Sequence, residues 1–167
     1  LNSGVDFLEI DVSKRAFFNK FCAQHNGLLG IAGIGTMLEK ILTAEVKTRA
    51  FLDLKPISFR NTFTHRLSQL LTKARVKNAK VCGHNWEQIS ILCAKTGASP
   101  FYTLKNKNSF KKFKSMMNDL RKPHGFSIKH NLIDKSLIRH LKSYYPTSEL
   151  WAWTVNEVKE IKRLQKL

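Results

Sequence analysis

Two carboxylates share one side of an apolar segment near the start of the chain. Residues 7–12 (FLEIDV) have the alternation of a β-strand, which places Glu9 and Asp11 on the same side. Such carboxylates repel each other and are costly to desolvate unless a cation lies between them. Oxygen ligands of this type suit Mg²⁺ or Ca²⁺. A partly exposed strand, or pairing of the carboxylates with lysines, would explain the pattern equally well.

A second strand repeats this arrangement further along the chain. In residues 51–56 (FLDLKP), Asp53 and Lys55 share one side at the strand end. The acid could complete a metal site while the ammonium stabilises negative charge that develops on a phosphate. An ordinary ion pair between the two side chains is the alternative interpretation.

One histidine and one tryptophan lie where a reacting group or a pocket wall could be. His25 follows a short predicted strand and precedes the turn signal Asn26-Gly27. Because its pKa is near neutrality, an imidazole there can act as a general acid or base, although most loop histidines do neither. Trp151 and Trp153 share a side of the last predicted strand. Trp151 fits core packing, and Trp153 at the strand end fits either the core or a pocket wall. The other histidines are weaker candidates, because they lie in predicted helices or near strand and loop boundaries (His65, His84, His124, His130, His140).

The elements that must position these residues alternate between strands and helices. Strands are predicted at residues 5–12, 20–24, 49–54, 79–82, 100–104, 126–130 and 149–155. Helices are predicted at residues 37–42, 62–73, 86–95, 109–121, 135–144 and 157–167, with Gly97 and Asp134 as terminal signals. This order predicts a parallel sheet with helical crossovers, either closed as a barrel or open and doubly wound. The sequence contains neither G-x-G-x-x-G nor G-K-S/T, which argues against dinucleotide and nucleoside triphosphate binding.

The composition is strongly basic. The 167 residues carry a net charge of +17, but lysines and arginines recur along the whole chain, and their densest cluster, residues 105–122, has the pattern of one amphipathic helix. We therefore expect solvated basic helix faces that attract anionic substrates and allow peripheral contact with an anionic membrane, and we expect no nucleic-acid partner. No apolar run is long enough to span a bilayer. The three cysteines form no C-x-x-C pair, which favours buried free thiols, a reducing compartment and a cytoplasmic location.

Four segments together resemble the glycerophosphodiester phosphodiesterase family. Residues 4–12 (GVDFLEIDV) are similar to the family motif G-A/V-D-x-I/V/L-E-x-D-V, and residues 153–156 (WTVN) to its late W-T-V-N motif. Residues 37–42 (MLEKIL) resemble its T-L-E-E-V-L helix, and residues 51–55 (FLDLK) its hydrophobic-E-hydrophobic-K strand. The four segments occur in the family order and span nearly the whole chain. The first and last motifs are the specific ones.

The resemblance implies a fold and an activity. The fold would be α/β, a TIM-type (β/α)8 barrel incomplete at both ends, with residues 1–167 forming one partial barrel domain. The activity would be metal-dependent hydrolysis of a small-molecule glycerophosphodiester to glycerol 3-phosphate and an alcohol. A lysophospholipid-cleaving relative, or a catalytically inactive barrel that serves as a binding module, are the alternatives.

The resemblance also assigns roles to individual residues. Glu9, Asp11 and Asp53 would bind the divalent metal, Mg²⁺ or Ca²⁺, with Asp53 at the position of a family glutamate. Lys55 would be the active-site lysine, and His25 would protonate the departing alkoxide. In addition, Trp153 would line the substrate pocket.

The sequence also departs from the family pattern. The His-Arg-Gly motif is expected upstream of Leu1 and the closing strand after Leu167, so we expect the segment itself to be inactive. Asn26 replaces the aspartate of the family's His-Asp pair, and Asp53 is one methylene shorter than glutamate. These two changes are what keep the binding-module alternative open.

Overall fold

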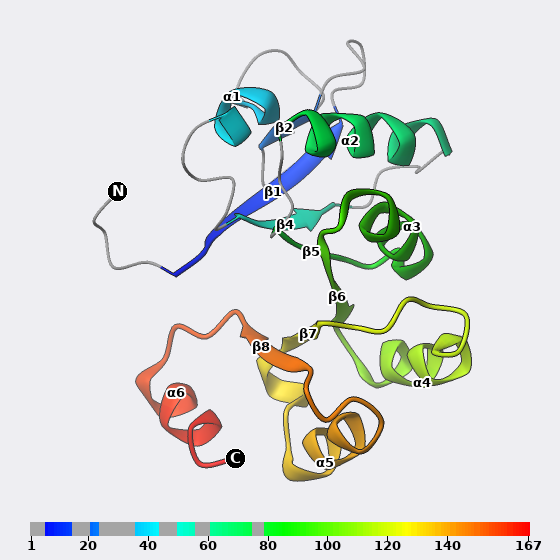
Figure 1. Cartoon of the computed structure of the whole chain (residues 1–167). Coiled ribbons are helices and arrows are strands. Elements are labelled where there is room, and N and C mark those ends of the chain that lie inside the picture. The colour runs from blue at the N-terminus through cyan, green and yellow to red at the C-terminus, as the bar shows by residue number, and fades with distance from the viewer. Residues whose placement is uncertain (1–5, 15–20, 24–35, 44–49, 56–60, 75–78) are drawn as a thin grey trace.

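The computed structural model describes residues 6–14, 21–23, 36–43, 50–55, 61–74 and 79–167 (Figure 1). The strands are β1 (Leu8–Lys14), β2 (Phe21–Ala23), β3 (Thr36–Met37), β4 (Ala50–Leu54), β5 (Lys80–Gly83), β6 (Ser99–Leu104), β7 (Gly125–Lys129) and β8 (Glu149–Trp153). The helices are α1 (Leu38–Thr43), α2 (Asn61–Lys73), α3 (Trp86–Thr96), α4 (Lys107–Met116), α5 (Lys135–Tyr144) and α6 (Val158–Leu164), with a 3₁₀ turn at His130–Leu132. None of the helices in these ranges has the length and apolar character needed to cross a bilayer.

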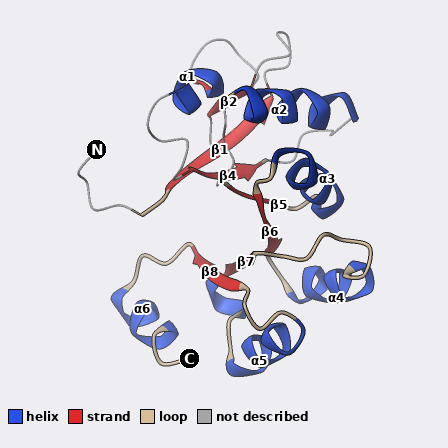
Figure 2. Cartoon of the chain, in the orientation of Figure 1, coloured by secondary structure: helices blue, strands red, loops and turns tan. Residues whose placement is uncertain are grey.

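All the strands belong to one sheet, in the order β3-β2-β1-β4-β5-β6-β7-β8. The pairings from β1 through β4 to β8 are all parallel, and a helix connects each consecutive pair from β4 onwards. These strands follow an arc with α2 to α5 on its outer side, and β1 and β8 lie at the two ends of the parallel series (Figures 1 and 2). The α/β class and the TIM-type arrangement of parallel strands are thus confirmed, with the sheet open between β1 and β8 in the described residues.

Two short strands at one edge differ from the prediction of a wholly parallel sheet. β2 is antiparallel to β1, with Val12 opposite Ala23, and β3 is antiparallel to β2, with Cys22 opposite Met37. Met37, which the sequence pattern placed in a helix, therefore ends β3, and α1 begins at Leu38. A two-residue strand is too short to show a period of its own, so the pattern of the following helix concealed it.

The basic helix is also displaced relative to its prediction. α4 begins at Lys107 because Asn106 and Ser109 form a capping box, in which the Asn106 side chain accepts from the Ser109 N–H at 2.8 Å. It ends at Met116 rather than at Arg121. The two predicted terminal signals are confirmed, since Asp134 accepts from the Leu137 N–H at 2.7 Å and Gly97 has a left-handed φ of 74°.

The two faces of the sheet have different cores. The outer face packs against the helices through apolar residues of alternating strand positions (Ile10, Val12, Leu52, Leu54, Val81, Tyr102, Leu104, Phe126, Ile128). The inner face holds a smaller cluster of Phe51, Cys82 and Phe101, with Phe7 and Trp151 packed against it. Trp151 stacks on Phe51 with ring centroids 4.7 Å apart, so its prediction as a core residue is confirmed. Cys82, Cys22 and Cys93 are buried and form no disulfide in the described residues, as predicted.

A buried lysine lies at the amino end of this inner face. Lys80, the first residue of β5, is 8% exposed, and its Nζ lies 2.5 Å from Oε2 of Glu149, the first residue of β8. The same ammonium lies 4.5 Å from the ring centroids of Phe7 and Trp151 and 5.1 Å from that of Phe101. Aromatic ring faces attract cations, and they do so more strongly when the cation is desolvated. Lys80 therefore joins the polar edge of the sheet to its aromatic interior.

Glu149 is the shared acceptor of this network. Beyond Lys80, its carboxylate accepts from Trp151 Nε1 at 2.7 Å and lies 2.9 Å from His124 Nε2. Burial by itself would raise the pKa of Glu149, but the hydrogen bonds from Lys80, His124 and Trp151 and the charge of Lys80 lower it below the ordinary 4.5. The ionised carboxylate is thus the form that the folded chain stabilises.

Because the pKa of Glu149 is lowered on folding, its contribution to stability is present above pH 4.5 and is lost as the pH falls through the folded-state value. A Glu149→Gln variant should therefore be less stable than the parent at neutral pH, and the difference should shrink on acidification. The difference should stay within about 1 kcal/mol, because the side chain is 39% exposed and its ion pair is screened by water. Urea unfolding of both proteins over a pH series measures it. A gap that does not change with pH would contradict this assignment.

Candidate active site

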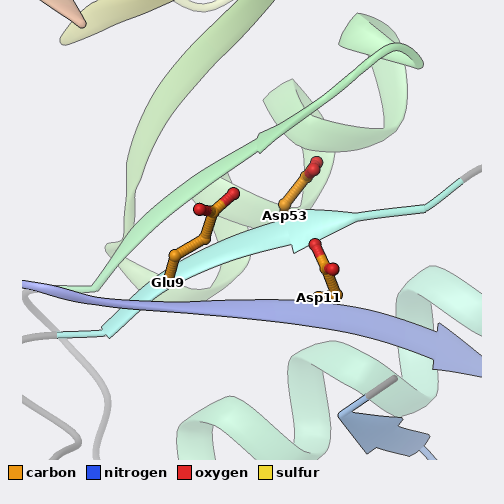
Figure 3. A group of neighbouring side chains, drawn as sticks. All are labelled: Glu9, Asp11 and Asp53. Carbon is orange, nitrogen blue, oxygen red and sulfur yellow. The ribbon is translucent and has the colours of Figure 1, made fainter. Parts of the chain in front are cut away.

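Three carboxylates meet on the inner face, near the carboxyl end of β4. Asp11 of β1 lies directly opposite Asp53 of β4, and Glu9 lies two residues before Asp11 on the same side. Each of the three residues has a carboxylate oxygen within 4.8 Å of those of the other two. Figure 3 shows the side chains projecting from β1 and β4 toward a common region. Glu9 is exposed, whereas Asp11 and Asp53 are partly buried.

Lys55 bridges two of these carboxylates. Its Nζ lies 2.6 Å from Asp11 Oδ1 and 2.5 Å from Asp53 Oδ2. Its backbone N–H donates to the Val12 carbonyl at 3.0 Å, which fixes the chain just beyond the end of β4. Burial lowers the pKa of Lys55, but the hydrogen bonds to Asp11 and Asp53 and their charges outweigh it and raise the pKa above its ordinary value. The side chain is therefore a cation at neutral pH.

A buried thiol lies next to the acidic cluster. Cys82 of β5 is opposite Asp53 in the sheet and is 2% exposed. Burial raises the pKa of the Cys82 thiol well above its usual value, and the charges of Asp53 and Glu9 act in the same direction. The thiol consequently stays protonated, and thiolate is the form that binds metals. The donors that this region offers are carboxylate oxygens.

The same edge of the sheet carries further basic groups. His84 follows β5 directly, and the exposed Lys105 follows β6. Partial burial lowers the pKa of His84, and the positive charges of Lys105 and Lys55 lower it further, while Asp53 acts in the opposite direction. The sequence pattern made His84 one of the weaker candidates for a site residue. Its position immediately after a buried strand is the signal that indicates a site residue, because side chains at the carboxyl ends of barrel strands surround the active site.

For two of the predicted site residues, His25 and Trp153, the described part of the structure gives no contact with the acidic cluster. His25, with its neighbour Asn26, lies outside the described residues. Trp153 is the last residue of β8 and is partly buried; its indole N–H is buried and lacks a hydrogen-bond partner in the described structure. The structure thus brings together Glu9, Asp11, Asp53 and Lys55, while the roles of His25 and Trp153 stay predictions.

Comparison with known proteins identifies the fold. No protein-family model matches the sequence, and no match was found among curated proteins. A glycerophosphodiester phosphodiesterase from Thermotoga maritima matches with a TM-score of 0.74 and 14% identity, covering 98% of this chain and 79% of that one. A glycerophosphodiester phosphodiesterase from Parabacteroides distasonis matches with a TM-score of 0.73 and 13% identity, covering 98% and 76%. The chain therefore has the fold of the glycerophosphodiester phosphodiesterases, as its sequence motifs predicted.

Proposed function

We propose that the protein is a metal-dependent phosphodiesterase that hydrolyses glycerophosphodiesters to glycerol 3-phosphate and an alcohol such as choline or ethanolamine. The observation that carries the proposal is the cluster of Glu9, Asp11 and Asp53 beside Lys55. The cluster lies near the carboxyl end of β4, and the carboxyl ends of the strands are where barrels of this type place their active sites. The fold shared with structures named as glycerophosphodiester phosphodiesterases supports the choice of substrate.

The carboxylate geometry fits one hard divalent cation. Oxygens bound to the same Mg²⁺ or Ca²⁺, each about 2.0–2.6 Å from the ion, lie at most about 4–5 Å apart. The oxygens of Glu9, Asp11 and Asp53, within 4.8 Å of one another, meet this condition without large rearrangement. The three donors are carboxylate oxygens, which favour Mg²⁺ or Ca²⁺ over softer metals. When bound, such a cation polarises a phosphoryl oxygen and makes an attacking hydroxyl more acidic.

The protein side chains would bind the cation, stabilise the transition state and protonate the leaving group. Glu9, Asp11 and Asp53 hold the cation. Lys55 turns its ammonium toward the phosphate and stabilises the negative charge that grows on it in the transition state. The imidazolium of His25 gives a proton to the departing alkoxide. In this proposal Trp153 forms part of the pocket wall.

The test is release of glycerol 3-phosphate from glycerophosphocholine by a protein in which the barrel is completed between β8 and β1 of this chain, with Mg²⁺, with Ca²⁺ and with a chelator. Activity that requires a metal and falls in a His25→Ala variant would support both the reaction and the role of His25. Metal binding without turnover on several head groups would contradict the proposal and favour a binding module. Turnover of lysophospholipids alone would instead redirect the substrate assignment.

Removing the Lys55 ammonium should change metal affinity and turnover in opposite directions. In a Lys55→Met variant the divalent cation no longer competes with an ammonium for Asp11 and Asp53, so its affinity should rise about tenfold. Turnover should fall about 100-fold, because a charge aimed at the transition state is lost. Calorimetric titration with Mg²⁺ and initial rates measure the two effects. A Lys95→Met variant, altered at an exposed lysine of α3, is the control, and weaker metal binding by the Lys55 variant would contradict the model.

A further inference from the structure

A groove lies outside the candidate active site, between α4 and the segment from the 3₁₀ turn through α5. Its volume is about 570 Å³. Lys107, Lys111 and Lys114 of α4 line it, spaced so that they share one side of the helix. The remaining lining combines apolar residues (Leu104, Phe110, Leu132, Leu137) with polar ones (Asn106, Asn131, Asp134, Ser136, His140). We call this the α4–α5 groove.

The groove is positively charged. α4 has the sequence KNSFKKFKSM, with no acidic residue, and the three lining lysines are exposed. In the part of the chain that the structure describes, none of the three forms an ion pair with an acid. The lining includes one acid, Asp134, whose carboxylate already accepts the Leu137 N–H at 2.7 Å as the cap of α5. An anion in the groove would therefore meet three cations and one acid that is engaged elsewhere.

The apolar part of the groove limits the kind of anion that fits. Phe110, Leu132 and Leu137 are only partly buried, so they present apolar surface beside the lysine row. His140 packs edge-on against Phe110 with ring centroids 5.2 Å apart, and its Nε2 is buried without a hydrogen-bond partner in the described structure. A ligand that combines a phosphate, a polar group and a short apolar stretch would satisfy all three features. A nucleic acid would leave the aliphatic surface of Leu132 and Leu137 unused, because bases stack on aromatic rings.

We propose that the α4–α5 groove binds the headgroup and first acyl carbons of an anionic phospholipid, and so attaches the protein to an anionic bilayer surface. The lysines would pair with the phosphate and carboxylate of the headgroup, and the apolar lining would contact the acyl carbons next to the glycerol. Leu104, the last residue of β6, and Asn106, just after this strand, line the groove, so one end of it lies at the carboxyl end of β6. The proposal goes beyond the phosphodiesterase activity and does not depend on it.

Binding to vesicles tests the proposal. The full chain should sediment with phosphatidylcholine vesicles that contain phosphatidylserine and stay in solution with phosphatidylcholine alone. Each lysine near an anionic surface is worth about 1 kcal/mol, so Lys107→Glu/Lys111→Glu/Lys114→Glu should weaken binding on the order of 100-fold. The matched control reverses the same number of exposed charges in α6 and just after it, as Lys159→Glu/Lys162→Glu/Lys166→Glu. Thermal unfolding of both variants checks that they are folded.

The outcomes distinguish binding in the α4–α5 groove from attraction of the vesicles by the overall positive charge of the protein. Selective loss in the α4 variant supports the proposal, whereas equal loss in both variants, or no binding to phosphatidylserine vesicles, overturns it. Tighter binding of a DNA duplex than of the vesicles, lost with the same lysines, would overturn it in favour of a nucleic-acid interface. Soluble dihexanoyl phosphatidylserine below its micelle concentration should shift the NMR signals of the His140 ring. Shifts confined to other parts of the chain would argue against the groove.

Discussion

Asp53→Asn is expected to remove the stabilisation of the protein by divalent cations. Asp53 supplies one of the three carboxylates that lie within 4.8 Å of one another, and asparagine keeps its shape but not its charge. A ligand that binds only the folded state stabilises it by about 2.7 kcal/mol at a concentration 100 times its dissociation constant. The parent protein should therefore melt at a higher temperature with saturating Mg²⁺ or Ca²⁺ than with a chelator, and the variant should not. Metal-dependent release of glycerol 3-phosphate should fall about 1000-fold, or about 4 kcal/mol in activation free energy.

Two further variants make this result interpretable. Asp53→Glu restores the carboxylate with the longer side chain of the family motif and should keep the stabilisation by metal. Asp119→Asn removes one carboxylate from an exposed turn after α4 and should behave as the parent does. If Asp53→Asn still responds to the cation, the metal binds elsewhere and the proposed site is wrong. Because the thermal readout does not require turnover, it is informative even if glycerophosphocholine proves to be the wrong substrate.

Lys80→Ala should lower the free energy of unfolding by about 3 kcal/mol. The substitution leaves the Glu149 carboxylate without its closest cation and removes the ammonium from between the rings of Phe7, Phe101 and Trp151. It also creates a cavity beside these rings, because the lysine stem is 8% exposed and fills the space. Urea denaturation at neutral pH measures the loss.

The chemical origin of that loss can be resolved with two controls. Lys80→Met keeps most of the stem volume and should cost less than alanine. Lys95→Ala changes an exposed lysine of α3 and should stay within about 0.5 kcal/mol of the parent. A Lys80→Ala protein as stable as the parent would show that the aromatic cluster and Glu149 do not depend on this cation.

The sequence was most informative where the chemistry is local. Glu9 and Asp11 are two residues apart on one strand, as are Asp53 and Lys55, so alternation alone predicted which side chains share a side. The alternation within one strand could not show whether Lys55 forms ion pairs with these carboxylates, because that contact depends on the register between β1 and β4. In the structure the register brings Asp11 opposite Asp53, and the lysine reaches both.

The sequence patterns could not predict contacts between residues that lie far apart in the chain. Lys80 and Glu149 are 69 residues apart, and each begins a strand that looks apolar on its own. The antiparallel edge was missed for a different reason. A strand was predicted at residues 20–24, where β2 lies, but the two-residue β3 carries no periodic signal, so no antiparallel partner for β2 was predicted. The helical crossovers from β4 to β8 were predictable because each helix is long enough to show its own amphipathic pattern.

The bridge from Lys55 to Asp11 and Asp53 also bears on the order in which the protein is assembled. Several carboxylates held close together repel one another and destabilise the folded state. In many metalloproteins this repulsion is relieved only when a metal ion binds during folding. Here the chain carries its own counter-cation, held 2.6 and 2.5 Å from two of the acids. Nascent protein made in a metal-depleted medium should therefore reach its native form first and acquire a divalent ion afterwards. On the proposed function, a shortage of the ion would then stop catalysis reversibly, while the chain stays folded and protected from proteolysis.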